Sequence, residues 1–249
     1  GMFFEFGEWG PGIREAREAI AVALKDHVDL EPHQIVITSS HTHAGTDLGG
    51  LNQGLGLGVD VDLLYDTQWH LVQVALAAAE AVAPAEISFI TSELNGWTKR
   101  DSDCSPVLDN QTSSMLVQWT DSSILPLYLI NFANHPTVLG SSNTAFSSDF
   151  VWGLRTAATA QGTRAMFIQG FIAAVHGSYS QATTSGFDRA LEYGQVLYEA
   201  ATSGDVRPNE TNFGIESKEV IFGCNALDSF LSRVFRFLDM PKRTVLDRD

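Results

Sequence analysis

The spacing of apolar residues predicts that helices and strands alternate along this chain. Residues 11–27 carry Ile13, Ala16 and Ile20 at helical spacing, with Pro11 in the first turn, so this segment is expected to be an amphipathic helix. Further helices are predicted over residues 60–82, 149–160, 186–202 and 226–238.

Short runs of branched and aromatic residues predict the strands. They cover residues 34–38, 87–91, 115–119, 125–131, 165–168 and 215–222. Three of these runs follow one another between residues 87 and 131 without a helix, which favours a mixed sheet over a purely parallel one. The expected fold class is α/β, as a single domain with a mixed β-sheet core flanked by helices.

Composition narrows the classes of function. The net charge of −15 argues against a nucleic-acid partner, because such a surface needs clustered lysine and arginine. No apolar run reaches the roughly 18 residues of a transmembrane segment. Cys104 and Cys224 stand far apart and have no metal-type spacing. No signal peptide is recognisable, so the sequence itself does not indicate a compartment.

The most informative residues are His41 and His43, which directly follow the predicted strand 34–38. Alternate side chains of an extended segment point to the same face, so the two imidazoles can converge on one metal ion. The glycine-rich residues after them would leave the pair open to a substrate. The alternative is a pair of loop histidines that are satisfied by hydrogen bonds.

A third histidine, His135, closes the apolar run 124–132 and precedes Pro136. Proline favours an extended conformation in the residue before it, which suits a histidine held where a strand ends. Catalytic zinc takes three protein ligands, and these segments offer candidates from separate strand ends. The residues therefore predict a metal hydrolase, with an ordinary turn histidine as the alternative for His135.

Three other residues are candidates for the same site. Asp149 can cap the helix that follows it, or it can orient a ligand histidine, and the local sequence does not separate these roles. His176 can line the site or be a polar loop residue. Arg100 can bind an anionic or carbonyl group, or it can be an exposed loop arginine.

Several motifs match one family in order and spacing. They are Ser-His-Thr-His-Ala-Gly-Thr at residues 40–46, Asn-Phe-Ala-Asn-His-Pro-Thr at 131–137, Ser-Ser-Asp at 147–149, and Gln-Gly-Phe-Ile-Ala-Ala-Val-His-Gly at 169–177. With these motifs the chain resembles the N-terminal catalytic domain of the neutral/alkaline non-lysosomal ceramidases, over roughly residues 10 to 205.

The resemblance implies a domain over residues 1–222, incomplete at its N-terminus. Residues 223–249 do not resemble the family and are expected to form a helical tail of unclear assignment. The resemblance implies hydrolysis of the amide bond of a ceramide-like N-acyl lipid, with Zn²⁺ as the cofactor. His41 and His135 would be zinc ligands, and His43 would steady the tetrahedral oxyanion. It also implies a secreted or periplasmic location.

The chain departs from the family pattern in ways that keep other functions open. His176 stands where the family has a serine, and the family's glutamate and tyrosine ligands have no match here. The alternative is therefore an inactive ceramidase-like binding or structural domain, or a fragment of a longer enzyme. A serine esterase using Ser148 or Ser178 would lack the Gly-x-Ser-x-Gly elbow. The apolar residues of 230–238 could promote a homo-oligomer.

Overall fold

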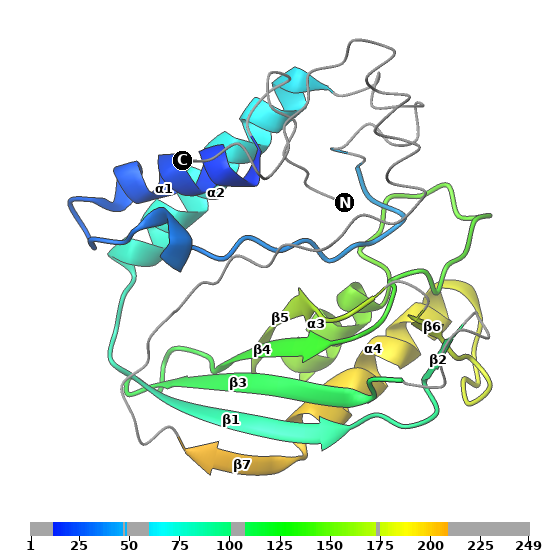
Figure 1. The fold of residues 1–249 in the computed structure, drawn as a ribbon. Helices are drawn as coiled ribbons and strands as arrows, with labels where there is room; N and C mark the ends of the chain where they lie inside the picture. The colour runs from blue at the N-terminus through cyan, green and yellow to red at the C-terminus, as the bar shows by residue number, and fades with distance from the viewer. Residues whose placement is uncertain (1–11, 47, 49–59, 101–107, 173–174, 209–249) are drawn as a thin grey trace. The chain divides into compact units, whose positions relative to one another are not determined.

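The computed structural model describes residues 12–46, 48, 60–100, 108–172 and 175–208 (Figure 1). The chain divides into two compact units. Of the described residues, the larger unit contains 38–46, 48, 81–100, 108–172 and 175–208, and the smaller unit contains 12–37 and 60–80. The predicted strand 215–222, the predicted helix 226–238 and the proposed tail 223–249 lie outside the described residues, as does most of the glycine-rich segment.

The larger unit is built on a five-stranded sheet with the strand order β5-β4-β3-β1-β7. The strands are β1 (Ala85–Glu93), β3 (Gln111–Trp119), β4 (Leu127–Phe132), β5 (Arg164–Gln169) and β7 (Asp205–Pro208). β4 and β5 pair in parallel, whereas the other neighbours pair antiparallel. The α/β class and the mixed sheet are thus confirmed.

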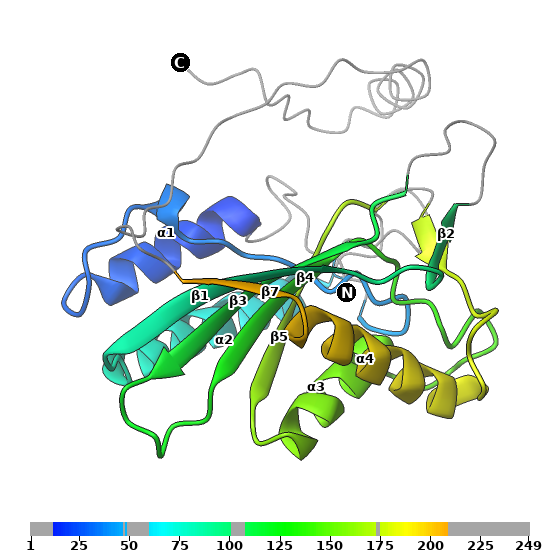
Figure 2. The ribbon, with the colours of Figure 1, turned by 90° about the horizontal axis from the view of Figure 1, so that it is seen from below.

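Two helices, α3 (Phe150–Ala160) and α4 (Gly186–Thr202), lie side by side on one face of this sheet (Figure 2). α3 connects β4 to β5, and a helical crossover of this kind is what allows two consecutive strands to run parallel. The core between the helices and the sheet is formed by fully buried side chains, among them Phe132, Phe150, Leu154 and Leu197.

Glycines allow the two helices to approach closely. A Cβ atom added to Gly153 would lie 2.5 Å from the carbonyl oxygen of Ala190, and one added to Gly194 would lie 2.2 Å from the amide nitrogen of Leu154. Both distances are shorter than van der Waals contact, so the helix backbones touch at a point where no larger residue fits.

A second, two-stranded sheet joins β2 (Thr98–Arg100) to β6 (Val175–Gly177) in antiparallel register. Neither strand was predicted, and neither was β7. Strands of three or four residues are too short to show the alternation of apolar and polar positions on which the prediction relies.

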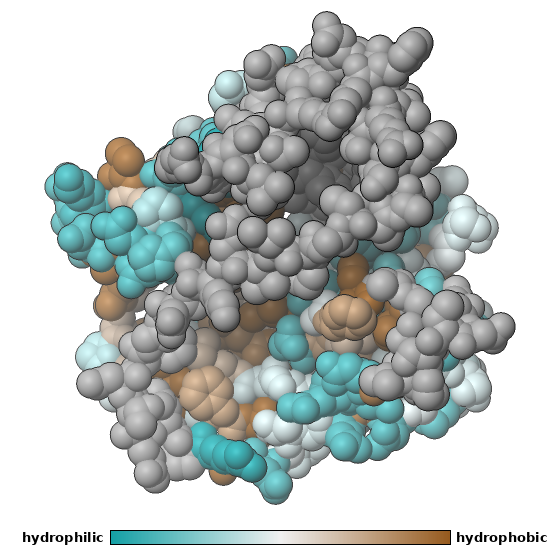
Figure 3. Space-filling view, viewed as in Figure 1, coloured by the Kyte–Doolittle hydropathy of each residue, from teal (hydrophilic) through white to brown (hydrophobic). Residues whose placement is uncertain are grey.

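The smaller unit contains α1 (Ile13–Leu24), the 3₁₀-helix η2 (Pro32–Gln34) and α2 (Val61–Glu80). The predicted helices 11–27 and 60–82 are confirmed, and α1 buries Ala16, Ile20 and Leu24 on one face. The visible surface around α1 is mainly hydrophilic (Figure 3), as expected for an amphipathic helix. No helix in the described ranges is long and apolar enough to span a bilayer.

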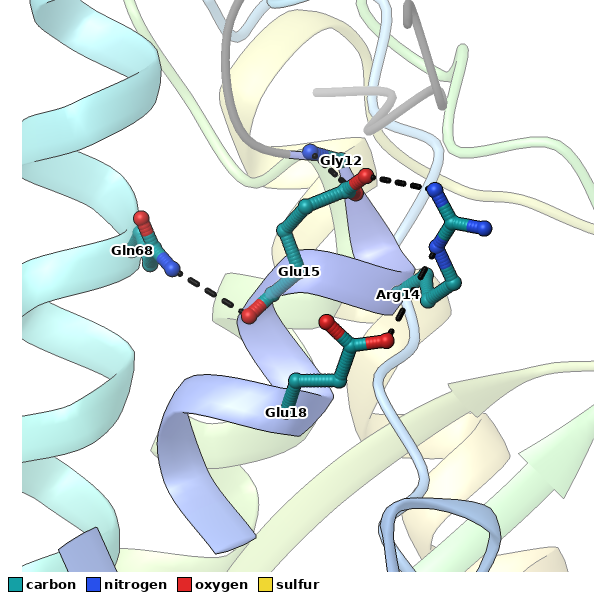
Figure 4. Close-up of polar contacts among 5 residues, drawn as sticks. All are labelled: Gly12, Arg14, Glu15, Glu18 and Gln68. Carbon is teal, nitrogen blue, oxygen red and sulfur yellow. Dashed lines mark hydrogen bonds and ion pairs between the residues drawn. The ribbon is translucent and has the colours of Figure 1, made fainter. Parts of the chain in front are cut away.

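The start of α1 is fixed by Glu15 (Figure 4). Its carboxylate accepts hydrogen bonds from the Gly12 amide and from Arg14, both at 3.0 Å. Its backbone carbonyl accepts a bond of 3.2 Å from Gln68 of α2. Burial raises the pKa of Glu15, but the bonds from Arg14 and the backbone amides outweigh it and lower the pKa to about 2.

The prediction of a buried strand over residues 34–38 is wrong. Gln34 ends the 3₁₀-helix, residues 35–38 are not part of a strand, and Val36 is 68% exposed. The run Ile-Val-Ile has a high intrinsic preference for β structure, but this preference is realised only where a neighbouring strand supplies a partner.

Candidate metal centre

Three histidines of the larger unit converge on one point: His41, His43 and His135. Each can offer one ring nitrogen, and these three atoms lie within 4.8 Å of one another. The ring centroids are separated by 5.1 Å for His41 and His43, 4.9 Å for His41 and His135, and 5.5 Å for His43 and His135. The convergence expected from the sequence is present.

The loop that bears His41 and His43 is hydrogen-bonded to Pro136 and to Ser147, the first and last residues of the segment 136–147. The hydroxyl of Thr42 donates to the carbonyl of Ser147 at 2.9 Å, and the amide of Ser147 donates to the carbonyl of Ala44 at 2.9 Å. The amide of His43 donates to the carbonyl of Pro136 at 3.4 Å. The first two bonds attach the His41–His43 loop to Ser147, and the third attaches it to the residue that directly follows His135.

The two histidines share a side for a reason that differs from the expected one. His41 does not end a strand; it adopts a left-handed backbone with φ of 61°, and a turn follows at His43 and Ala44. A residue other than glycine held in this conformation costs on the order of 1 kcal/mol or more, and the surrounding bonds must maintain it. Strain of this kind is often found at functional sites.

His135 is oriented by a backbone carbonyl. Its Nδ1 lies 2.6 Å from the carbonyl oxygen of Val175 in β6, and the residue is only 8% exposed. A carbonyl can only accept, so Nδ1 carries the hydrogen and Nε2 presents its lone pair. Histidines that bind metals typically donate their other ring nitrogen to a carbonyl or carboxylate in this way.

The protonation of the cluster also suits a metal ion. Burial, followed by the nearby His135 and His43, lowers the pKa of His41 to about 4. Burial and His135 likewise lower the pKa of His43. Neutral imidazoles are the form that binds zinc, so both rings are in the binding form at pH 7.

The distances require a small adjustment to accommodate zinc. Zn–N bonds of about 2.0–2.1 Å in tetrahedral geometry place ligand nitrogens roughly 3.3 Å apart. The separation of up to 4.8 Å therefore has to close by about 1.5 Å. His43 is exposed and can rotate its side chain toward the other two rings. The donor set fits a divalent ion such as Zn²⁺.

His176 lies beside the cluster. Its ring stacks on that of His135, with centroids 5.1 Å apart and planes inclined by 16°. The lone pair of each ring nitrogen lies in the plane of its ring. Because the two planes are stacked and nearly parallel, these rings do not aim at one ion in the observed conformation. In the antiparallel register of β2 and β6, His176 lies opposite Lys99 and Val175 lies opposite Arg100. The side chain of Arg100 lies outside the described part of the structure.

Asp149 is the N-cap of α3. Its carboxylate accepts bonds from the amides of Phe150 at 2.7 Å, Leu139 at 3.0 Å and Val138 at 3.1 Å. Burial raises its pKa, and the three amides and His43 only partly offset that increase. The capping role is therefore observed.

Sequence reasoning missed the carbonyl of Val175, because a backbone group has no sequence signal. It also missed Asn134, a fully buried amide next to His135. A polar residue next to an apolar run was the available signal.

A cavity of about 660 Å³ lies elsewhere in the same unit, near the C-terminal ends of α3 and α4, and none of the three histidines lines it.

Solved structures resemble this fold. A crystal structure of neutral ceramidase from Pseudomonas aeruginosa superposes with a TM-score of 0.62 at 16% identity, over 82% of this chain. The chain has a ceramidase-like fold. A ceramidase complexed with C2 gives a TM-score of 0.59 at 15% identity, over 76% of this chain. The match covers about a third of the length of each of these ceramidases, 35% of the first chain and 33% of the second. No protein-family model and no curated protein matches the sequence.

Proposed function

We propose that this chain carries the metal centre of a zinc-dependent amide hydrolase that acts on a ceramide-like N-acyl lipid or a related linkage. The observation that carries the proposal is the convergence of His41, His43 and His135 within a ceramidase-like fold. The fold alone does not determine a reaction, so the argument depends on the chemistry of these side chains.

The residues divide into two roles. His41 and His135 would hold the ion: the first is kept neutral chiefly by burial, and the second is oriented by the carbonyl of Val175. A bound zinc ion supplies an activated water at neutral pH and polarises the substrate carbonyl. In this proposal His43, the most exposed of the three, would donate to the oxygen that becomes negative during attack.

His176 and Asp149 support this arrangement. His176 covers one face of His135 and limits its rotation. Asp149 holds the 138–139 backbone against α3 and so fixes the segment that follows His135. Arg100 is the backbone register partner of Val175 and in this proposal would bind the acyl carbonyl or a polar headgroup.

The first test is zinc content after supplementation and dialysis. The double variant His41→Ala/His135→Ala should lose the near-stoichiometric zinc of the unmodified protein. The matched control, His33→Ala/His70→Ala, removes two histidines from the smaller unit and should retain it. Equal zinc in all three proteins, or none in the unmodified protein, would refute the centre.

The role of His43 needs a separate measurement. If it donates to the oxyanion, His43→Ala should retain zinc but lower kcat on N-acyl amides by roughly 100-fold or more. If it is the third ligand, the same change should release the metal.

An inactive binding or structural domain is the second candidate. Within the described ranges the metal-binding group consists of histidines, with no carboxylate among its members. A site made of histidines alone could hold zinc without hydrolysing a substrate. Stoichiometric zinc with no hydrolysis of N-acyl amides or simple esters would favour this candidate.

A further inference from the structure

A buried hydrogen-bonded link leads from α4 to the residue before His135. The hydroxyl of Tyr193 lies 2.6 Å from the carbonyl of Trp97 and 2.5 Å from Nδ2 of Asn134. Tyr193 and Asn134 are both 0% exposed. The hydroxyl must donate its one hydrogen to Trp97, because a carbonyl can only accept. The amide nitrogen of Asn134 must therefore face Tyr193, which fixes the orientation of the Asn134 side chain.

The other end of this link reaches the carbonyl that orients His135. The carbonyl of Trp97 also accepts the amide of Ser178 at 2.8 Å, and Ser178 directly follows β6. β6 contains Val175, whose carbonyl holds Nδ1 of His135. Tyr193 is thus connected to both determinants of the ring position, namely the backbone that carries His135 and the strand that supplies its hydrogen-bond acceptor.

The position of Tyr193 is itself tightly constrained. Its ring packs edge-on against Trp97 at 5.2 Å and lies 5.0 Å from the ring of Phe150. The next residue, Gly194, lies where the backbones of α4 and α3 come close together. Oδ1 of Asn134 has no hydrogen-bond partner among the described residues, so the bond to Tyr193 is what anchors this amide.

We propose that Tyr193 is a positioning residue of the histidine cluster. Acting through Asn134 and Trp97, it keeps His135 in the tautomer with hydrogen on Nδ1 and with Nε2 available to a metal ion. This inference rests on the proposed metal centre for its consequence, but the geometry of His135 can be measured without any metal.

The test compares Tyr193→Phe with Tyr198→Phe. Tyr198 is a second buried tyrosine of α4, and its hydroxyl bonds to Thr163 at 2.7 Å, beside the cavity at the opposite end of α3. Each variant loses one buried tyrosine hydroxyl from the same helix. A general loss of stability should therefore affect both variants alike, whereas a positioning role should affect only Tyr193.

Two readouts are needed. In metal-free protein, nitrogen NMR of the His135 ring should show a single Nδ1–H tautomer in the unmodified protein and in Tyr198→Phe, and a mixture in Tyr193→Phe. In a zinc competition titration, Tyr193→Phe should bind about tenfold more weakly, as found for residues that orient metal ligands, and Tyr198→Phe should stay within about twofold.

The outcomes separate the two proposals. An unmodified protein that binds no zinc refutes the metal centre, and the tautomer measurement then decides the positioning role by itself. An unchanged tautomer in folded Tyr193→Phe overturns the positioning role. If that variant does not fold, Asn134→Ala takes its place, because it cuts the same link and leaves the bond between Tyr193 and Trp97 intact.

Discussion

The contact between α3 and α4 gives the sharpest stability prediction, for the variant Gly194→Ala. The added Cβ would lie 2.2 Å from the amide nitrogen of Leu154, 2.3 Å from the carbonyl oxygen of Phe150 and 2.4 Å from the carbonyl carbon of Gly153. All three atoms belong to the backbone, so no side chain can rotate away. Since ordinary contact begins at 3.4 Å, the two helices must separate by about 1 Å.

The change in unfolding free energy is a balance between two costs, overpacking and lost dispersion contacts, and one gain in helix propensity. Overpacking a core costs about 1–3 kcal/mol and occasionally more, and a clash with rigid backbone belongs at the upper end. A gap of about 1 Å also forfeits up to half of the dispersion energy of each separated pair, which affects Phe150, Leu154 and Leu197. Alanine regains roughly 1 kcal/mol of helix propensity over glycine. The net expectation is a loss of about 2–3 kcal/mol.

Urea unfolding at 25 °C, followed by tryptophan fluorescence, measures this difference. The matched controls are Gln195→Ala and Gln195→Gly at the neighbouring exposed position of α4, and the difference between them reports local helix propensity alone. If Gly194→Ala instead stabilises the protein by about 1 kcal/mol, the gain in helix propensity is the only effect of the change, and the close contact between the helices is refuted.

Two further predictions concern protonation. The folded-state pKa of Glu15 is lowered to about 2, so its contribution to stability is present above pH 4.5 and is lost as the pH falls through 2. The stability difference between the unmodified protein and Glu15→Gln should therefore shrink over that range in urea unfolding; a difference independent of pH would contradict the cap. The pKa of His41 is lowered from 6.5 to about 4, so its contribution is present above pH 6.5 and is lost as the pH falls toward 4. An NMR titration of the metal-free ring should show a midpoint well below 6.5, and an ordinary midpoint would mean that the ring is solvated.

The sequence predicted the long elements well because their signals are local. The helix Gly186–Thr202 matches its predicted range, and α3 starts directly after the capping Asp149. The failures involve structure that depends on distant partners. Residues 34–38 have the composition of a strand but no described pairing, and β2 and β6 exist only because each pairs with the other.

The candidate site divides in the same way. The histidines could be found because imidazole is chemically distinctive, and the anchoring of His41–His43 on Ser147 could not, because it joins residues 105 positions apart. Nor does the sequence show that the carbonyl of Val175, rather than a carboxylate, orients His135. Such a partner becomes visible only when β6 has been placed.

The distance along the chain between the parts of the histidine cluster would couple metal binding, if it occurs as proposed, to folding. Thr42 and Ser147 are 105 residues apart and His135 and Val175 are 40 apart, so the full cluster exists only after three remote segments have assembled. An ion bound there would favour the folded state by about 2.7 kcal/mol at a free concentration of 100 times Kd. His41 and His43, only two residues apart, would still hold the ion weakly in the unfolded chain and so reduce this stabilisation. Zinc should thus stabilise the folded larger unit, and its melting temperature should rise with the logarithm of the free zinc concentration.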